Sequence, residues 1–427
     1  MSYREYSQLS ERVYWKTLEH GLTVAVLPRP GFTKKLAYFV TDYGAVHTQM
    51  LLDGQQQTAP AGVAHYLEHK LFDMPGRDVS GEFAAMGANV NAFTSYDMTA
   101  YYFSCTENFD ACLHLLLEFV STPYFTEETV SKEQGIIGQE IDMTADSPET
   151  AVFENLMRAM YKNHPIHTPI LGTRQTISQI TPQVLQDCHR GFYNPANMML
   201  CVVADVQPEQ VCAIAQKVLG SEKRPCAGKQ TAWQEEMTGV QPLVTAAMEV
   251  AMPMFQLGFK AEPLERGEAA VRQELVADLA AEALFGESSE LYLRLYEQGV
   301  IDSSFGGGFE TVTGMAMLTA SGDAHEPEVI RDTILRQAAV LAEQGIDQQE
   351  FDRIKRSAMG RRIRSIDSFD ATCFRLCAYH FSGFDYFGFP ALYAAIQKEE
   401  LQDFIRRVVT PERCSLSVIT PNTQEVM

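Results

Sequence analysis

The chain has 427 residues, 46% of them apolar and 21% charged, a composition that at this length predicts a globular protein of two or three domains. Its 34 lysines and arginines against 55 aspartates and glutamates leave a net charge of −21, which argues against nucleic acid as a partner because no basic surface can neutralise phosphates. Apolar runs are too short to span a membrane, the first residues lack the apolar core of a secretory signal, and nine cysteines are scattered. These features predict a cytoplasmic protein with reduced thiols and no membrane partner.

The first elements in chain order are two strands, at residues 22–27 and 37–43, followed by an apolar helix at residues 63–72. Later in the same half we expect a strand pair at residues 88–105, broken near Ser95-Tyr96-Asp97, and a helix at residues 109–119.

The helix at 63–72 contains His65-Tyr66-Leu67-Glu68-His69. Residues four apart lie one turn apart on one helix face, so His65 and His69 would converge there. Two imidazoles from one helix are half of a catalytic zinc site. Glu68 can reach a water on such a metal, and the order H-x-x-E-H is the inverzincin signature. A chance match on an ordinary amphipathic helix is the alternative.

A second helix is predicted at residues 130–143, after an acidic start. Glu133 and Glu140 are seven residues, or two turns, apart in it and share one face. Two carboxylates on one face can supply a third metal ligand and a group that orients a ligand. A solvated acidic stripe is the alternative, because glutamate is common on exposed helix faces.

The chain also appears to repeat itself. Ile180 and Leu200 match Ile396 and Leu416, each 216 residues further on (396 − 180 and 416 − 200). Residues 63–72 match 276–285, so the second half places Asp278, Ala281 and Glu282 opposite His65, Glu68 and His69. Likewise it places Lys355 and Arg362 opposite Glu133 and Glu140. Only the first half therefore keeps a possible metal site.

This duplication predicts two homologous domains, at residues 1–222 and 240–427, joined by a linker poor in apolar residues near 221–242. Strands come in meander-like groups with helices at irregular intervals, including a strand at 198–204. We therefore expect an α+β fold in which each domain is a mainly antiparallel, mixed sheet covered by helices. The run Gly306-Gly307-Gly308 is interpreted as a turn or strand break.

With these motifs, the chain resembles the pitrilysin/insulysin/mitochondrial-processing-peptidase family of inverzincins, and among them the half-size bacterial zinc-bearing, YmfH-like group. The resemblance extends over nearly the whole chain. It is carried by the H-x-x-E-H motif, the two distal glutamates and the stretches Gly87-Ala88-Asn89-Val90-Asn91-Ala92-Phe93-Thr94, His164-Pro165, Gly172-Thr173 and Tyr193-Asn194-Pro195.

The resemblance implies one zinc per chain, held by His65, His69 and Glu140, with Glu68 as general base and Glu133 orienting a ligand. It implies a clamshell of homologous domains around a peptide chamber. It also implies that Asn91 and Ala92 lie on an edge strand that receives the substrate as an added strand.

One departure concerns substrate binding. Active relatives carry an Arg and a Tyr in the C-terminal half, where this chain has Leu295 and Asp302. In some half-size members the zinc site and this pair lie on separate chains. We therefore expect the partner to be a homologous half-size subunit that carries the Arg/Tyr pair, in a heterodimer; self-association is the alternative.

The function predicted from these features is that of a zinc endopeptidase that hydrolyses enclosed peptides, as the catalytic subunit of a pair. Two alternatives stay open. The first alternative is a non-catalytic, chaperone-like subunit of a peptide-processing complex. The second is a dedicated processing peptidase for one biosynthetic peptide. Retention of both histidines disfavours the non-catalytic reading.

Overall fold

The computed structural model describes residues 1–422 and groups them into two compact units. The first unit holds residues 1–141, 169–230 and 363–387; the second holds residues 142–168, 231–362 and 388 onward. Neither unit is a continuous segment, because each includes one stretch from the other half of the sequence. Division into homologous domains at 1–222 and 240–427 stays a prediction.

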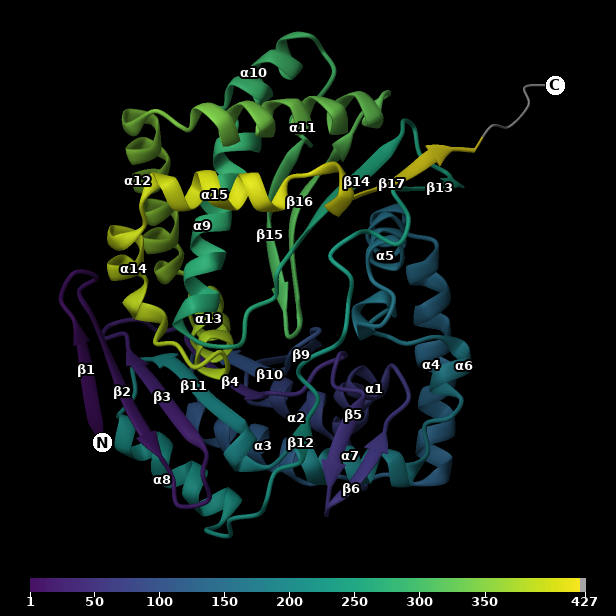
Figure 1. Cartoon of the computed structure of the whole chain (residues 1–427). Helices are drawn as coiled ribbons and strands as arrows, with labels where there is room; N and C mark the ends of the chain where they lie inside the picture. The colour runs from purple at the N-terminus through teal and green to yellow at the C-terminus, as the bar shows by residue number, and fades with distance from the viewer. Residues whose placement is uncertain (423–427) are drawn as a thin grey trace. The chain divides into compact units, whose positions relative to one another are not determined.

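The first unit is built on a seven-stranded sheet of order β1-β2-β3-β11-β4-β10-β9 (Figure 1). β11 pairs in parallel with β3, and the other neighbours are antiparallel. Its strands are β1 (Ser2–Tyr6), β2 (Glu11–Thr17), β3 (Thr23–Pro28), β4 (Lys35–Thr41), β9 (Asn89–Thr94), β10 (Thr99–Cys105) and β11 (Met198–Ala204). Short strands form two small sheets: β5 (Gln49–Leu52), β6 (Gln55–Thr58) and β12 (Gly228–Lys229) in one, β7 (Asp73–Met74) and β8 (Arg77–Asp78) in the other.

Most helices of the first unit lie wholly within it. They are α1 (Val63–Leu71), α2 (Val79–Ala85), α3 (Phe109–Ser121), α6 (Arg174–Ile177), α7 (Pro182–Phe192), α8 (Pro208–Leu219) and α13 (Phe369–Phe381). α4 (Glu127–Ala145) begins in the first unit and ends in the second. Short 3₁₀ turns occur at η2 (Pro195–Asn197), η3 (Ser365–Asp367) and η4 (Tyr386–Gly388).

The second unit is built on a five-stranded sheet of order β13-β17-β14-β16-β15. Its strands are β13 (Leu243–Met248), β14 (Met254–Ala261), β15 (Gly306–Val312), β16 (Met315–Asp323) and β17 (Cys414–Pro421). Its helices are α5 (Pro148–Met160), α9 (Glu268–Phe285), α10 (Glu290–Glu297), α11 (Pro327–Gln344), α12 (Gln348–Arg364), α14 (Phe389–Ala395) and α15 (Lys398–Val408), with 3₁₀ turns η1 (Pro165–His167) and η5 (Pro411–Arg413).

The two sheets repeat one topology. The order β3-β11-β4-β10-β9 in the first unit corresponds strand for strand to β13-β17-β14-β16-β15 in the second. In both sheets the last strand in the chain lies between the two corresponding neighbours. β11 pairs in parallel with β3 and antiparallel with β4, and β17 pairs in parallel with β13 and antiparallel with β14. Duplication therefore accounts for the architecture, and the predicted α+β class with mixed sheets is confirmed.

The two exchanged segments each contribute one helix to a sheet. α5 packs on β13, β14 and β17 of the second unit, whereas α13 packs on β4 and β11 of the first. Both helices start at a serine N-cap, Ser147 or Ser368, whose side chain accepts a main-chain N–H from the first turn. Each follows the corresponding long helix of its half, α4 or α12, so the exchange respects the duplication.

The triple glycine was interpreted wrongly as a turn or strand break, because Gly306, Gly307 and Gly308 open β15. At Gly307 a Cβ atom would lie 2.4 Å from the Phe285 ring, so close packing of α9 on β15 requires glycine there. Within residues 1–422, no helix is both long and apolar enough to cross a membrane.

Candidate metal centre

Helix α1 is held firmly by the core of the first unit. It starts after Gly62, whose φ of 97° is left-handed and where a Cβ would lie 2.6 Å from the Leu171 carbonyl oxygen. Val63, Leu67 and Leu71 on its apolar face join the core. The Tyr66 hydroxyl donates a short hydrogen bond to the Val130 carbonyl of α4, so the two helices that carry the candidate ligands are fastened to each other.

Helix α4 presents both predicted glutamates on one face. The helix starts where the Thr126 hydroxyl accepts the Thr129 N–H at 3.2 Å, a typical N-terminal cap. Val130 and Ile137 anchor it to the core of the first unit. The seven-residue spacing then leaves Glu133 and Glu140 on the side that faces α1.

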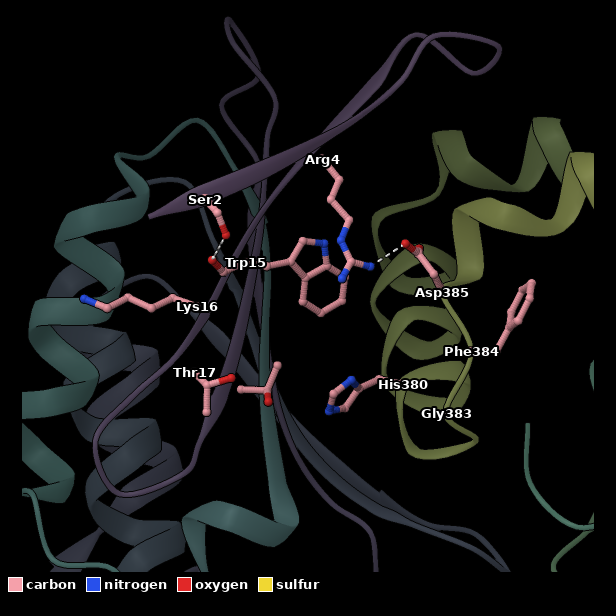
Figure 2. Close-up of a pocket in the computed structure, with 10 residues that line it drawn as sticks. Ser2, Arg4, Trp15, Lys16, Thr17, His380, Gly383, Phe384 and Asp385 are labelled. Atoms are coloured by element: carbon pink, nitrogen blue, oxygen red, sulfur yellow. Dashed lines mark hydrogen bonds and ion pairs between the residues drawn. The ribbon is translucent and has the colours of Figure 1, made fainter. Parts of the chain in front are cut away.

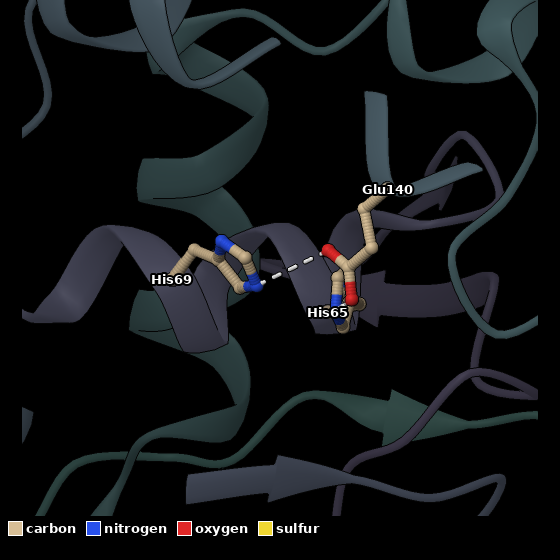
Figure 3. Close-up of side chains that lie close together, drawn as sticks. All are labelled: His65, His69 and Glu140. Carbon is tan, nitrogen blue, oxygen red and sulfur yellow. Dashed lines mark ion pairs between the residues drawn. The ribbon is translucent and has the colours of Figure 1, made fainter. Parts of the chain in front are cut away.

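Three side chains converge between these helices (Figure 3). His65 Nε2 lies 3.7 Å from Glu140 Oε1, and His69 Nε2 lies 3.6 Å from Glu140 Oε2. The donor atoms of His65, His69 and Glu140 all lie within 4.8 Å of one another. Bonds of about 2.0–2.2 Å to a tetrahedral zinc would place ligand atoms roughly 3.3–3.5 Å apart, so this donor set fits zinc after a small adjustment.

The pKa values of the two histidines shift in opposite directions. Burial, together with the neighbouring His69, lowers the pKa of His65 to about 3, so its imidazole is neutral and keeps a lone pair for a ligand. Burial lowers the pKa of His69 as well, but a hydrogen bond and charge from Glu133 and the charges of Glu140 and Glu68 outweigh it and raise that pKa. The carboxylates around His69 therefore favour a positive charge at its imidazole when no metal is bound.

Glu133 meets the side of His69 that faces away from Glu140. Its Oε1 lies 2.9 Å from His69 Nδ1. A carboxylate bound to the far nitrogen of a ligating imidazole fixes the ring orientation and the tautomer. The structure thus separates the two glutamates: Glu140 lies with the donor group, and Glu133 lies behind one member of it.

Glu68 occupies a half-buried position next to the same site. Its Oε2 accepts a hydrogen bond of 2.6 Å from the Thr94 hydroxyl of β9. Burial raises the pKa of Glu68, while hydrogen bonds from Thr94 and the charge of His69 oppose that rise. A carboxylate whose pKa is raised by burial is a better proton acceptor and donor near neutral pH than an exposed one.

The predicted substrate residues lie at the edge of the first unit's sheet. β9, which contains Asn91 and Ala92, is the outermost strand and pairs with β10 alone in that sheet. The Ala92 N–H donates to Asn91 Oδ1 at 2.8 Å, so the Asn91 side chain covers this main-chain donor. An added strand would have to replace that contact.

The second half has ion pairs in place of the candidate metal group, which consists of His65, His69 and Glu140. Arg362 on α12 lies 2.9 Å from Glu274 and 3.7 Å from Asp278, and Arg361 lies 2.7 Å from Glu282. The positions opposite His65 and His69 are therefore carboxylates, and the positions opposite the second helix's glutamates are cations. The sequence already placed these residues opposite the candidate ligands, but it did not show which of them pair, since pairing across α9 and α12 depends on how the two helices pack.

The Leu295 side chain, at the position of the family's arginine, is 2% exposed and belongs to the apolar core of the second unit. Asp302 is exposed, and its carboxylate accepts the Ser304 N–H at 2.7 Å. Neither residue offers a cation or an aromatic hydroxyl for a peptide.

A separate cavity of about 440 Å³ lies in the first unit, between the β1–β2 hairpin and the end of α13 (Figure 2). At its wall the Arg4 guanidinium pairs with Asp385 at 2.7 Å and lies over the Trp15 ring. Its lining shares no residue with the metal group, so we assign the candidate chemistry to the site between α1 and α4.

Comparisons with known proteins agree with this geometry. Residues 55–174 match the insulinase family (peptidase family M16), and residues 179–358 match the peptidase M16 inactive domain. The chain is 34% identical to the uncharacterized zinc protease YmfH of Bacillus subtilis (strain 168), over 98% of this chain and 99% of that protein.

Solved structures extend the likeness to the fold. An M16-like peptidase from Alicyclobacillus acidocaldarius superposes with a TM-score of 0.92 at 30% identity, over 96% of this chain and 99% of that one. Pitrilysin, with a TM-score of 0.79 at 17% identity, shares the fold over 98% of this chain but only 46% of its own.

Proposed function

We propose, from the premise that this chain belongs to the insulinase family of peptidases (M16), that it is the zinc-bearing subunit of an endopeptidase that cleaves enclosed peptides. The chain is a zinc metallopeptidase by its relatives and by its His/His/Glu group. The observation that carries the finer proposal is that His65, His69 and Glu140 converge while Glu68 lies beside them.

In this proposal His65, His69 and Glu140 hold one zinc ion per chain. Zinc at such a site supplies Lewis acidity toward the scissile carbonyl and lowers the pKa of water. Glu68 accepts the proton of the attacking water and delivers it to the leaving amine. Glu133 keeps the His69 ring in place through Nδ1.

The substrate in this proposal is an extended peptide. It adds to the edge of β9, where it displaces the Asn91 side chain from the Ala92 N–H and pairs with the main chain of Asn91 and Ala92. Selection then depends on pockets and size more than on one residue. Stable folded proteins are poor substrates, because they cannot present a free strand to that edge.

The decisive experiment is Glu68→Gln, which keeps the shape of the side chain but removes its ability to take a proton. The variant should retain about one zinc per chain and lose peptide hydrolysis by a factor of about 100 or more, measured by metal analysis and a peptide assay. The exposed Glu128→Gln at the start of α4 is the matched control and should behave as the parent. Full hydrolysis by Glu68→Gln would overturn the assigned base.

We also propose that this subunit works with a homologous chain. A buried Leu295 and an exposed Asp302 at the positions of the family's substrate-binding pair support this, because the chain cannot grip a peptide with them. Self-association is the competing arrangement, with other residues of the second half in contact with the peptide.

A further inference from the structure

We propose that Thr94 is a positioning residue that holds the Glu68 carboxylate in the orientation needed for proton transfer. This inference rests on the proposed function, since it gives the general base a partner. The contact that carries it is the 2.6 Å hydrogen bond from Thr94 Oγ1 to Glu68 Oε2, which joins the last residue of β9 to α1.

The geometry of β9 explains why the hydroxyl reaches the site. Side chains alternate between the two faces of a strand, so Val90, Ala92 and Thr94 share one face. Val90 and Ala92 pack against the core that includes α1, and β9 contacts α1 directly. Thr94 therefore points toward α1 from the end of the strand, where it pairs in register with Thr99 of β10.

The helix itself gives Glu68 no comparable support. Side chains three and four positions away on a helix are its surface neighbours. For Glu68 three of these are Ala64, Leu71 and Phe72, which cannot hydrogen-bond to a carboxylate. The fourth is His65, whose Nε2 faces Glu140 and whose buried Nδ1 makes no hydrogen bond. A glutamate side chain has several rotatable bonds, so an ordered carboxylate needs a partner from another element. β9 supplies it.

The same strand is the proposed docking edge for the substrate. Ala92 lies two residues before Thr94 on the same face of β9. A peptide bound along β9 and a base fastened to β9 share one rigid reference, so the distance between them stays constant. Catalysis loses rate steeply when a reacting group is misplaced by about 1 Å, which makes such a shared reference effective.

The test compares Thr94→Val, which keeps the shape but removes the hydroxyl, with Thr94→Ser, which restores it. In the zinc-loaded full chain, with its partner chain present if the parent requires one, Thr94→Val should lower kcat about 10–100-fold. KM should stay within about threefold of the parent and zinc content should be unchanged, because the substitution removes only a side-chain hydroxyl bonded to Glu68 and leaves the main chain of β9 as it is. Thr94→Ser should recover most of the lost kcat.

Ser95→Ala is the matched control, since it removes a hydroxyl one residue further along. The Ser95 hydroxyl bonds within the hairpin turn, to the main chain of Met98. A loss of kcat in Ser95→Ala equal to that in Thr94→Val would mean that hairpin stability, not the base, is affected, and would overturn the proposal. Parent-like kcat in Thr94→Val would overturn it as well.

A crystal structure of Thr94→Val supplies a readout without activity. The Glu68 carboxylate should leave its place beside residue 94 or become disordered, while His65, His69 and Glu140 stay together. An unmoved Glu68 would refute the role of Thr94. If the parent neither binds zinc nor cleaves peptides, the proposed function fails, yet the diffraction result still decides whether Thr94 orders Glu68.

Discussion

At the scale of single residues, the candidate centre is defined by which groups stay neutral and which stay charged. Burial lowers the pKa of His65 to about 3, so its imidazole is neutral and can serve as a metal ligand. Burial lowers the pKa of His69, but the carboxylates around it raise that pKa by more, and Glu133 hydrogen-bonds to its Nδ1. The two glutamates of one helix face therefore occupy different positions, Glu140 beside both imidazoles and Glu133 behind His69.

This difference predicts an order of effects on metal binding. Glu140→Gln should weaken zinc binding strongly, because it removes one of three donors. Glu133→Gln should lower activity with a smaller loss of affinity, about 10–100-fold, because it only loosens the orientation of His69. Competition with a chromogenic chelator measures both affinities. A weaker zinc complex in Glu133→Gln than in Glu140→Gln would reverse the two assignments.

At the scale of elements, helices α9 and α12 of the second unit correspond to α1 and α4 of the first, but they carry ion pairs in place of the candidate metal ligands. Two carboxylates opposite the histidines, Asp278 and Glu282, face Arg362 and Arg361. The Arg362 side chain is 6% exposed and also lies near the rings of Phe389 and Tyr393. These ion pairs join α9 to α12 at the positions where the first unit has the candidate metal ligands.

Arg362→Met should destabilise the second unit by about 1–3 kcal/mol, because it removes the Arg362 cation from beside the partly buried Glu274 and Asp278. Zinc content should not change, since the metal group lies in the first unit. Arg361→Met is the control, because that side chain is 53% exposed and an exposed pair contributes little. Chemical denaturation measures the difference; equal stability of the two variants would contradict this account of α9 and α12.

At the scale of the whole molecule, the fold of this chain corresponds to about half of a longer chain. It spans 46% of pitrilysin, whose single chain is about twice as long. Within the described residues, the second half of this chain carries no metal-binding group like that of the first half. Leu295 and Asp302 occupy the positions predicted for the Arg/Tyr pair of active relatives. A zinc site can activate water, but holding a peptide in a reactive position is a separate contribution of several kcal/mol.

We therefore expect the isolated chain to be weakly active or silent, and a homologous chain with the Arg and Tyr but without H-x-x-E-H to restore cleavage. Size-exclusion chromatography of each chain and of the mixture, with a peptide assay on every peak, distinguishes the cases. Activity in a peak of this chain alone at twice its mass would support self-association. Full activity of the monomer would refute a divided site and leave the zinc assignment intact.

The sequence by itself determined what depends on local periodicity. The four-residue spacing of His65 and His69 and the seven-residue spacing of Glu133 and Glu140 place each pair on one helix face, whatever the rest of the chain does. Alternation and turn residues located the strand pair that became β9 and β10. The repeat predicted two sheets of one topology, because matched segments fold by the same local rules.

Only the tertiary structure decided how these pieces meet. α1 and α4 converge through core packing and the Tyr66 hydrogen bond, which no spacing in the sequence reveals. Three further features join residues that are distant in the sequence. Arg362 pairs with Asp278, and Thr94 bonds to Glu68, 26 positions away. Helices α5 and α13 pack on the sheet of the other half of the sequence. Such contacts depend on the packing of whole elements, whereas periodicity constrains only residues within one element.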